Sequence, residues 1–246
     1  MNYSVILPIL NEKGHIIELI KKIRFIFSEI HQEYEIILVD DGSMDGTIDL
    51  VKNMEKDYDN IKLFVRQGLK KNLANSINLG IQKSKYENII WMDADFQHPP
   101  EYIKLLHDFQ KKYDLVIFSR FLKHSIRYFE SDKSKKKLNE NQSFFYNKLC
   151  NFFLYRDFTD YTSGFICVKK KIFDNYKLKG NYGDYFVNFV VYCKINHFSM
   201  IELPFKDGAR FSGSSKTSMK NPFNYFYLTI HYFLSLINNF FRKILS

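Results

Sequence analysis

The first 120 residues alternate short apolar runs with segments in which apolar residues recur every three or four positions. Short apolar runs bounded by turn-forming residues are typical of buried strands, whereas the longer period is typical of amphipathic helices. Strands are predicted at 3–9, 34–39, 61–65, 89–92 and 115–118, and helices at 14–30, 45–54, 73–82 and 99–111. This alternation predicts an α/β fold with a mostly parallel sheet flanked by helices on both faces.

The second half of the chain is less regular. Residues 123–142 are polar and basic and lack apolar periodicity, so we predict a long loop there, of a length that is usually functional or disordered. The elements predicted after it are a helix at 144–155, a strand at 165–168, a helix at 185–195, a strand at 200–203 and a Gly- and Ser-rich loop at 205–220. Residues 1–220 are therefore expected to form one domain.

The C-terminal residues 221–246 are predicted as an amphipathic helix. Apolar residues such as Phe226, Phe233 and Ile237 recur at helical spacing, with Asn224 and His231 opposite them. The apolar run is just long enough to span a bilayer, but polar residues interrupt it. Three placements stay open: a helix lying in the membrane interface, which is favoured, a helix docked on the preceding domain, and a membrane span.

Composition narrows the class of protein. With 46% hydrophobic residues among 246, disorder is excluded as the main state. The net charge of +9 favours partners that carry phosphate or an anionic membrane surface, although an AT-rich coding sequence would also enrich lysine. Three cysteines without C-x-x-C spacing argue against a disulfide framework and a structural zinc site. The N-terminus lacks signal-peptide features, so we expect a cytoplasmic protein.

The strongest chemical signal is the segment WMDADFQHPPE at residues 91–101. Asp93 and Asp95 follow a predicted strand, and Gln97 comes two residues later, so that their oxygens can turn toward one point. Hard oxygen ligands of this kind suit Mg²⁺ or Mn²⁺, which would bridge the phosphates of a nucleotide. A bare D-x-D is common in solvated turns, and two further segments are therefore needed to support the metal site.

Those segments are LPILNEKGHI at 7–16 and VDDGSMDGT at 39–47. Both follow predicted strands, and the carboxyl ends of parallel strands meet at one edge of a sheet, where ligands bind. Asp45 could instead cap the helix that follows it. Neither G-x-G-x-x-G nor G-x-x-x-x-G-K-[ST] is present, which argues against dinucleotide-binding and P-loop sites.

Taken together, these motifs resemble the family 2 glycosyltransferases with a GT-A, Rossmann-like fold, over about residues 3–216. DADFQHPPE, SRF at 119–121, TSGF at 162–165 and RFSGSSK at 210–216 resemble in particular the dolichyl-phosphate and polyprenyl-phosphate mannosyltransferases. The resemblance implies a catalytic domain at 1–220, with a flexible acceptor loop at about 121–143, followed by a membrane-associating helix at 221–246.

The resemblance also implies roles for individual residues. The nucleoside pocket of a GDP-mannose-like donor would be lined by Pro8, Glu12, Val39 and Asp41. The metal and the diphosphate would be held by Asp93, Ala94, Asp95 and Gln97, with Asp93, Asp95 and Gln97 as metal ligands. The phosphates of the donor or of the lipid acceptor would contact Arg120, Arg210 and Lys216. The residues expected to take part in catalysis are Asp95, Arg120, Asp160, Arg210 and Lys216.

The sequence departs from the family pattern at two positions. Leu10 stands where the family usually has Tyr, and Asn147 stands where an Arg is often found. The phosphate contact of that Arg is then missing or is supplied by Arg127 or Lys148. His98 is followed by Pro99 and is expected to place the turn rather than to transfer a proton.

The chemistry of a lipid phosphate acceptor requires no general base, because the phosphate is already ionised near neutral pH. Cations and a metal ion would stabilise the leaving nucleoside diphosphate. Asp160 is expected to shape the acceptor side of the site. Asp184 is expected either to cap a helix or to act as a base toward a hydroxyl acceptor.

We therefore expect metal-dependent, inverting transfer of a hexose, foremost mannose, to a polyprenyl or dolichyl phosphate at the cytoplasmic membrane face. The alternative is a family 2 enzyme that glycosylates a hydroxyl of a saccharide or glycolipid in cell-surface polysaccharide synthesis. Peripheral attachment and a separate membrane subunit both stay open. Nucleic acid is not expected as a partner, because the acidic segments would put like charge where its phosphates sit.

Overall fold

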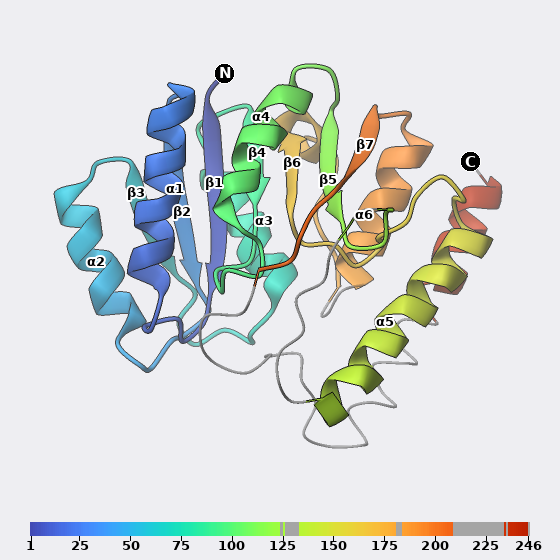
Figure 1. The fold of residues 1–246 in the computed structure, drawn as a ribbon, viewed down its shortest axis with the longest axis horizontal. Helices are drawn as coiled ribbons and strands as arrows, with labels where there is room; N and C mark the ends of the chain where they lie inside the picture. The colour runs from blue at the N-terminus through green and yellow to red at the C-terminus, as the bar shows by residue number, and fades with distance from the viewer. Residues whose placement is uncertain (124, 126–132, 181–183, 209–233, 235, 246) are drawn as a thin grey trace.

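The computed structural model describes residues 1–123, 125, 133–180, 184–208, 234 and 236–245, and of 133–142 it describes the backbone alone. Within these residues, seven strands form one sheet in the order β3-β2-β1-β4-β6-β5-β7 (Figure 1). The strands are β1 Tyr3–Ile9, β2 Tyr34–Asp40, β3 Ile61–Val65, β4 Asn88–Trp91, β5 Leu115–Ser119, β6 Ile166–Lys169 and β7 Met200–Pro204. Only β6 runs antiparallel to its neighbours in this described sheet. The mostly parallel α/β fold expected from the sequence is confirmed.

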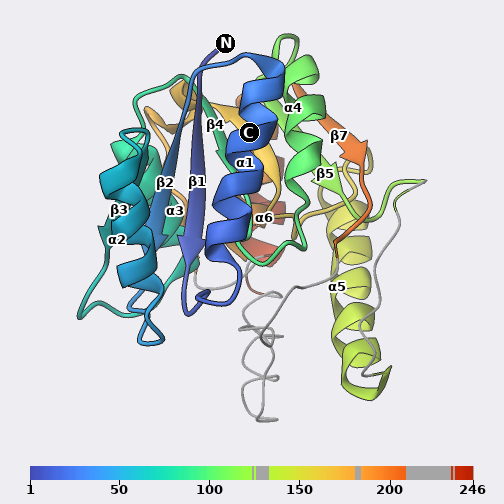
Figure 2. The ribbon, with the colours of Figure 1, turned by 60° about the vertical axis from the view of Figure 1, so that its left-hand side comes forward.

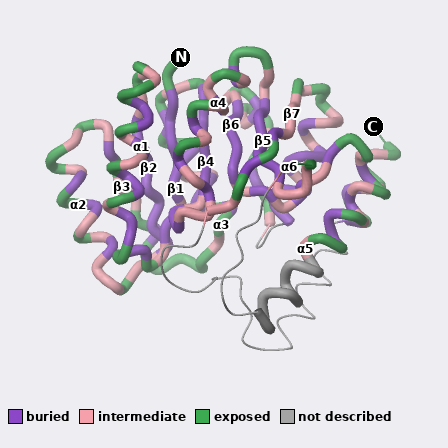
Figure 3. Tube along the Cα trace, viewed as in Figure 1, coloured by how far each residue is buried: buried purple, intermediate pink, exposed green. Residues whose placement is uncertain are grey.

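Helices cover both faces of the sheet, as the two views in Figures 1 and 2 show. Their bounds are α1 Ile16–Ile30, α2 Thr47–Asp57, α3 Leu73–Lys83, α4 Ile103–Gln110, α5 Lys133–Phe153 and α6 Asp184–Ile195. Apolar residues of α1, α2 and α4 share one buried cluster with the sheet, and those of α3, α5 and α6 share the other. The core therefore consists of two apolar layers separated by the sheet, and the buried residues are concentrated along the central strands (Figure 3).

Strand β1 shows how the sequence produces these two layers. Val5 and Leu7 belong to one cluster and Ile6 to the other, because successive side chains of a strand point to opposite faces. A Cβ on Gly80 would lie 2.5 Å from Ile6 Cγ2, so the missing side chain allows α3 to approach β1 closely. The parallel strands β1, β2 and β4 end at the same edge of the sheet, where the predicted site residues lie.

The loop predicted over residues 123–142 is wrong from Lys133 onward, because α5 begins there. The physical reason is that residues 133–142 have no apolar periodicity to indicate a helix, yet they also contain no Gly or Pro. Lys, Glu, Gln and Leu are good helix formers, so a polar helical turn can extend from the apolar segment at 144–155. The acceptor loop expected at about 121–143 is accordingly shorter.

The described part of the C-terminal segment, residues 236–245, is helical and docks on the domain. Leu236 is buried, and Asn239 Nδ2 donates to Asn188 Oδ1 of α6 at 2.8 Å. The predicted apolar stripe takes part only partly: Phe240 packs against the core and the Phe153 ring, whereas Leu234 and Phe241 remain 53% and 57% exposed. Among the described helices, none combines the length and the hydropathy that a membrane crossing requires.

Candidate active site

The loop after β4 brings the two aspartates of the D-x-D motif to the edge of the sheet. Within it, the backbone N–H of Gln97 donates to Asp95 Oδ1 at 3.1 Å, and Phe96 takes a positive φ of 66°. These features turn the chain back toward the sheet. Asp95 is buried, whereas the side chain of Asp93 is 50% exposed. Asp93 is therefore the more accessible of the two carboxylates.

His98 fixes the start of this loop. Its Nδ1 accepts the backbone N–H of Asp93 at 2.8 Å, and its ring stacks on Phe165 with centroids 5.0 Å apart. Burial lowers the pKa of His98 to about 4, so the ring is neutral at pH 7. This contact supports the turn-placing role that the sequence favours for His98.

Two glycines show which segments meet the D-x-D loop. A Cβ on Gly164, in the TSGF motif, would lie 3.7 Å from Asp93 Oδ1 and 3.9 Å from the Tyr185 hydroxyl. A Cβ on Gly208 would lie 1.9 Å from the carbonyl oxygen of Phe96, so that position accepts no side chain. The segment after β7 and the segment before β6 therefore both reach the D-x-D motif, although they are distant from it in sequence.

The residues predicted for the nucleoside pocket lie at the ends of β1 and β2. Pro8 and Val39 are direct partners in the parallel pairing of these strands. Asp41 is buried, and its carboxylate accepts hydrogen bonds from the Arg66 guanidinium and from the backbone N–H of Asn72. Glu12 Oε2 lies 2.9 Å from His15 Nε2. The four predicted residues are thus brought to one edge of the sheet.

The loops after β1 and β2 are tied together by side chains. Asn11 N–H donates to Ser43 Oγ at 2.7 Å, and Lys13 N–H donates to Asp45 Oδ2 at 3.1 Å. Asp45 Oδ1 also accepts the N–H of Thr47, the first residue of α2, at 3.0 Å. Asp45 therefore bonds the first residue of α2, although the N-cap position itself is Gly46, which has no side-chain cap bond.

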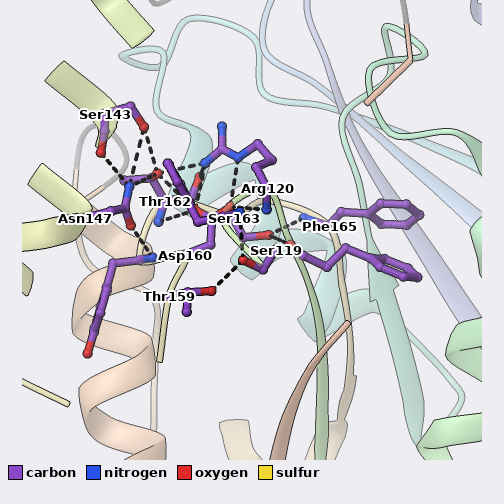
Figure 4. Close-up of polar contacts among 12 residues, drawn as sticks. Ser119, Arg120, Ser143, Asn147, Thr159, Asp160, Thr162, Ser163 and Phe165 are labelled. Carbon is purple, nitrogen blue, oxygen red and sulfur yellow. Dashed lines mark hydrogen bonds and ion pairs between the residues drawn. The ribbon is translucent and has the colours of Figure 1, made fainter. Parts of the chain in front are cut away.

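Arg120 and Asp160 form the second carboxylate–guanidinium pair of the site (Figure 4). Arg120 follows β5, and its Nε and Nη2 donate to Asp160 Oδ2 and Oδ1, both at 2.8 Å. Burial alone would lower the pKa of Arg120, but the Asp160 carboxylate raises it above the usual value. Burial would likewise raise the pKa of Asp160, but Arg120 lowers it. Both groups are therefore charged, and their geometry is the bidentate one.

The same guanidinium is also bound to the TSGF segment. Arg120 Nη2 donates to the carbonyl and hydroxyl oxygens of Thr162 at 2.9 and 2.8 Å. Among the described residues, none accepts a hydrogen bond from Arg120 Nη1, and the side chain remains 27% exposed. Nη1 is thus the atom of Arg120 that can reach a ligand. Asp160, for which the sequence predicts a role on the acceptor side, orients this guanidinium.

Asn147, which replaces the Arg of the family pattern, has a packing role. Its Oδ1 accepts the N–H of Tyr161 at 2.6 Å, and its Nδ2 donates to Thr162 Oγ1 at 3.0 Å. It connects α5 to the loop that carries Asp160 (Figure 4). Lys148 Nζ lies 4.6 Å from the centroid of the Phe144 ring on the exposed side of α5. Arg127 lies outside the described residues.

Arg210 and Lys216, both predicted to contact phosphate, also lie outside the described residues. Two residues that sequence reasoning missed contact predicted ones: Arg66 binds Asp41, and Glu202 of β7 accepts the N–H of Asp160 at 2.9 Å. The available signal for Glu202 was a charged residue inside the apolar segment MIELP. For Arg66 it was a cation directly after the third predicted strand.

The described residues contain no group of three or more His, Cys, Asp or Glu side chains that could hold a metal ion. Mg²⁺ is commonly held by one or two carboxylates together with water and the phosphates of the substrate. The half-exposed Asp93, the nearby Asp95 and the amide of Gln97 fit this mode of binding.

Asp184 is buried at the first residue of α6.

Comparison with known sequences gives extended matches. The chain is 29% identical over 226 residues to the dolichol-phosphate mannosyltransferase of Pyrococcus furiosus, and the aligned region covers 92% of this chain and 62% of that protein. It is 33% identical to the undecaprenyl-phosphate 4-deoxy-4-formamido-L-arabinose transferase of Pseudomonas fluorescens over 46% of this chain and 34% of that protein. The chain thus spans less than two thirds of the length of these relatives.

Comparison with solved structures supports the same architecture. Glucosyl-3-phosphoglycerate synthase from Mycobacterium tuberculosis, in complex with Mn²⁺, UDP and phosphoglyceric acid, matches with a TM-score of 0.66. The match covers 97% of this chain and 78% of that one at 13% identity, and therefore concerns the fold alone. Residues 4–177 match the sequence profile of Glycosyl transferase family 2. The chain therefore belongs to the glycosyl transferase family 2.

Proposed function

We propose that the protein transfers a hexose, with inversion, from a nucleotide sugar to a polyprenyl or dolichyl phosphate. The observation that carries this proposal is the Arg120 guanidinium, which Asp160 orients at the edge of the sheet where the D-x-D motif lies. Asp93 also raises the pKa of Arg120, after the larger effects of burial, Asp160 and Asp207. This proximity supports a site in which a phosphate-binding cation and the metal-binding D-x-D carboxylates act together.

Mannose from a GDP-mannose-like donor is the proposed sugar, since a relative that matches 92% of the chain is named a mannosyltransferase. Asp93, Asp95 and Gln97 would hold Mg²⁺ or Mn²⁺. A metal ion bound there would offset the charge of the leaving diphosphate. Pro8, Glu12, Val39 and Asp41 would line the nucleoside pocket, and Arg210 and Lys216 would add phosphate contacts.

In the proposed reaction, an oxygen of the lipid phosphate attacks the anomeric carbon on the face opposite the leaving group. The bond from that carbon to the diphosphate oxygen breaks, and its electron pair leaves with the nucleoside diphosphate, so the configuration inverts. The attacking phosphate is already ionised, and the protein therefore needs no base. Arg120 Nη1 would donate to a phosphate oxygen and stabilise charge that grows in the transition state.

The acceptor is proposed to reach the site from a membrane surface at the cytoplasmic face. Four side chains on α5 and on the C-terminal helix are strongly exposed for apolar residues: Phe145 at 63%, Phe152 at 61%, Phe241 at 57% and Leu245 at 84%. The cations of Lys148 and Arg156 lie over the Phe144 and Phe152 rings. An apolar face edged by cations suits an anionic lipid interface. A membrane subunit could cover the same face.

The decisive test is product formation. Purified protein would be incubated with Mg²⁺ or Mn²⁺, a short-chain polyprenyl phosphate and a panel of radiolabelled nucleotide sugars, and the label in the organic phase counted. Label from one donor, lost without metal and in Asp95→Ala, is the expected result. Donor binding that depends on metal, with no label extracted from any donor, contradicts the lipid phosphate acceptor.

A hydroxyl acceptor is the second candidate, because Asp184 is buried at the start of α6 and could serve as a base, while the hydroxyl of its neighbour Tyr185 approaches Gly164 of the TSGF segment. The structural neighbour from Mycobacterium tuberculosis was solved with a small phosphorylated acid, phosphoglyceric acid. Asp184→Asn separates the two candidates. A hydroxyl acceptor would make the variant inactive, whereas a lipid phosphate acceptor would leave its activity close to that of the wild type.

A further inference from the structure

Glu202 lies in β7 beside Ile117 of β5, and its carboxylate accepts three hydrogen bonds from one short segment. The backbone N–H of Thr159 donates to Oε2 at 2.7 Å. The Thr159 hydroxyl and the backbone N–H of Asp160 donate to Oε1 at 3.0 and 2.9 Å. All three donors belong to the two residues that place the Asp160 side chain against Arg120.

A second link runs from the same segment to the chain around Arg120. The hydroxyls of Thr159 and Ser119 are 2.7 Å apart, and Ser119 Oγ accepts the backbone N–H of Phe121 at 3.1 Å. Arg120 therefore lies between two residues connected to Thr159, while its own backbone N–H donates to Asp160 Oδ2 at 3.0 Å. Movement of Thr159 would displace the backbone and the side chain of Arg120 together.

We propose that Glu202 is a positioning residue that holds the Thr159–Asp160 segment and, through it, orients the guanidinium of Arg120. The inference rests on the proposed function, in which Arg120 contacts phosphate. A carboxylate suits this position because it only accepts hydrogen bonds, and all three neighbours donate. An amide in its place would direct its own N–H groups at one of these donors.

One substitution of Glu202 removes the carboxylate and is still expected to give a folded protein. Burial raises the pKa of Glu202 to about 7, although the hydrogen bonds from Asp160 and Thr159 lower it. Replacement of the buried carboxylate by neutral Gln removes the cost of burying a charge, and this offsets the cost of the misdirected N–H group. Glu202→Gln is therefore expected to fold, so that a functional defect can be measured in an intact protein.

The first experiment observes Arg120 directly in the full chain. Protein labelled with ¹⁵N-arginine is compared by NMR as wild type and Glu202→Gln, and Arg120→Lys assigns the Arg120 Nε–H signal by its loss. The expected result is a shifted Nε–H signal that exchanges faster with water. Glu35→Gln is the matched control, because Glu35 Oε1 accepts the N–H of Lys85 at 2.7 Å at the opposite end of the sheet. An unshifted signal in Glu202→Gln overturns the proposal.

The second experiment measures turnover in the same variants. Glu202→Gln should lower kcat by about tenfold, since small displacements of a group that acts in the transition state have effects of this order. In the Arg120→Lys background it should have little further effect, because Glu202 acts through Arg120. Independent, additive losses contradict the proposal. A wild type that is inactive with polyprenyl phosphate contradicts the proposed function instead, and the NMR comparison still decides the role of Glu202.

Discussion

Two buried Arg–Asp pairs stand at the same edge of the sheet, and their surroundings give them different roles. Arg66 pairs with Asp41 on the proposed nucleoside side, where its side chain is 7% exposed. Arg120 pairs with Asp160 on the proposed acceptor side, where its side chain is 27% exposed. The pairs contain the same residue types, so sequence alone does not separate them.

The difference lies in where the remaining donors point. Arg66 Nη1 also donates to the carbonyl of Asn72 at 3.1 Å and to Ser76 Oγ at 2.9 Å, and these bonds attach the third strand to α3. Arg120 directs Nε and Nη2 to the protein and leaves Nη1 without an acceptor among the described residues. An arginine that is buried among protein acceptors stabilises the fold, whereas one that is partly exposed and has a donor left over can present that donor to a ligand.

Arg120→Ala is the most severe way to test this comparison. We expect kcat to fall by about a thousandfold, as is typical when a donor that stabilises transition-state charge is removed. The loss is expressed per folded molecule, with the folded fraction measured by circular dichroism, because Asp160 is also left buried without its cation. The measurement is turnover with saturating donor, compared with Arg66→Ala corrected for its folded fraction. Equal losses in the two variants would mean that the two pairs do not differ in function.

Arg66→Ala should instead reduce stability. It leaves Asp41 buried without its cation, and removal of one partner of a buried pair lowers the free energy of unfolding by about 4 kcal/mol. Urea unfolding at pH 7 measures this effect. Arg66→Met separates the loss of charge from the loss of packing, because it removes the cation but keeps an apolar side chain of similar length. A stability equal to that of the wild type would show that the bonds of Arg66 do not support the fold.

The acceptor side should also respond to pH through Glu202. Its pKa is raised by burial from the usual 4.5 to about 7, so its neutral form favours folding. Its stabilising contribution is complete below pH 4.5 and is lost as the pH rises through 7, by up to about 3 kcal/mol. Urea unfolding of wild type and Glu202→Gln at pH 5 and pH 8 measures the difference. Parallel stability curves would mean that Glu202 does not titrate in this range.

The smallest expected effect concerns the surface of the acceptor side. Phe152→Ser on α5 should weaken binding to anionic vesicles by about fivefold, which corresponds to about 1 kcal/mol of lost apolar contact. Phe25→Ser on α1 is the matched control, because both phenylalanines are 61% exposed. Co-sedimentation with vesicles measures the binding. Equal weakening by both substitutions would show that α5 is not the membrane-facing element.

Much of the donor side could be predicted from the sequence. Asp93 and Asp95 come directly after an apolar strand, and the fold places that strand beside β1. Each of these predictions depends on residues that are close in sequence. The role of Asn147 could not be predicted in this way, because its partners Tyr161 and Thr162 lie in a loop beyond the end of α5. The start of α5 at Lys133 could not be predicted either, because residues 133–142 lack the apolar periodicity that indicates a helix.

By itself, the sequence determined the order of strands and helices and the edge at which the acidic segments lie. The spacing of apolar residues within a short segment shows whether that segment forms a strand or a helix and which of its residues are buried. Only the tertiary structure decided which arginine each aspartate binds, since Arg120 and Asp160 are 40 residues apart in the chain. It also decided that Glu202 contacts the segment that holds Arg120. Such partners depend on how separate loops pack, and the periodicity of a chain carries no information about that packing.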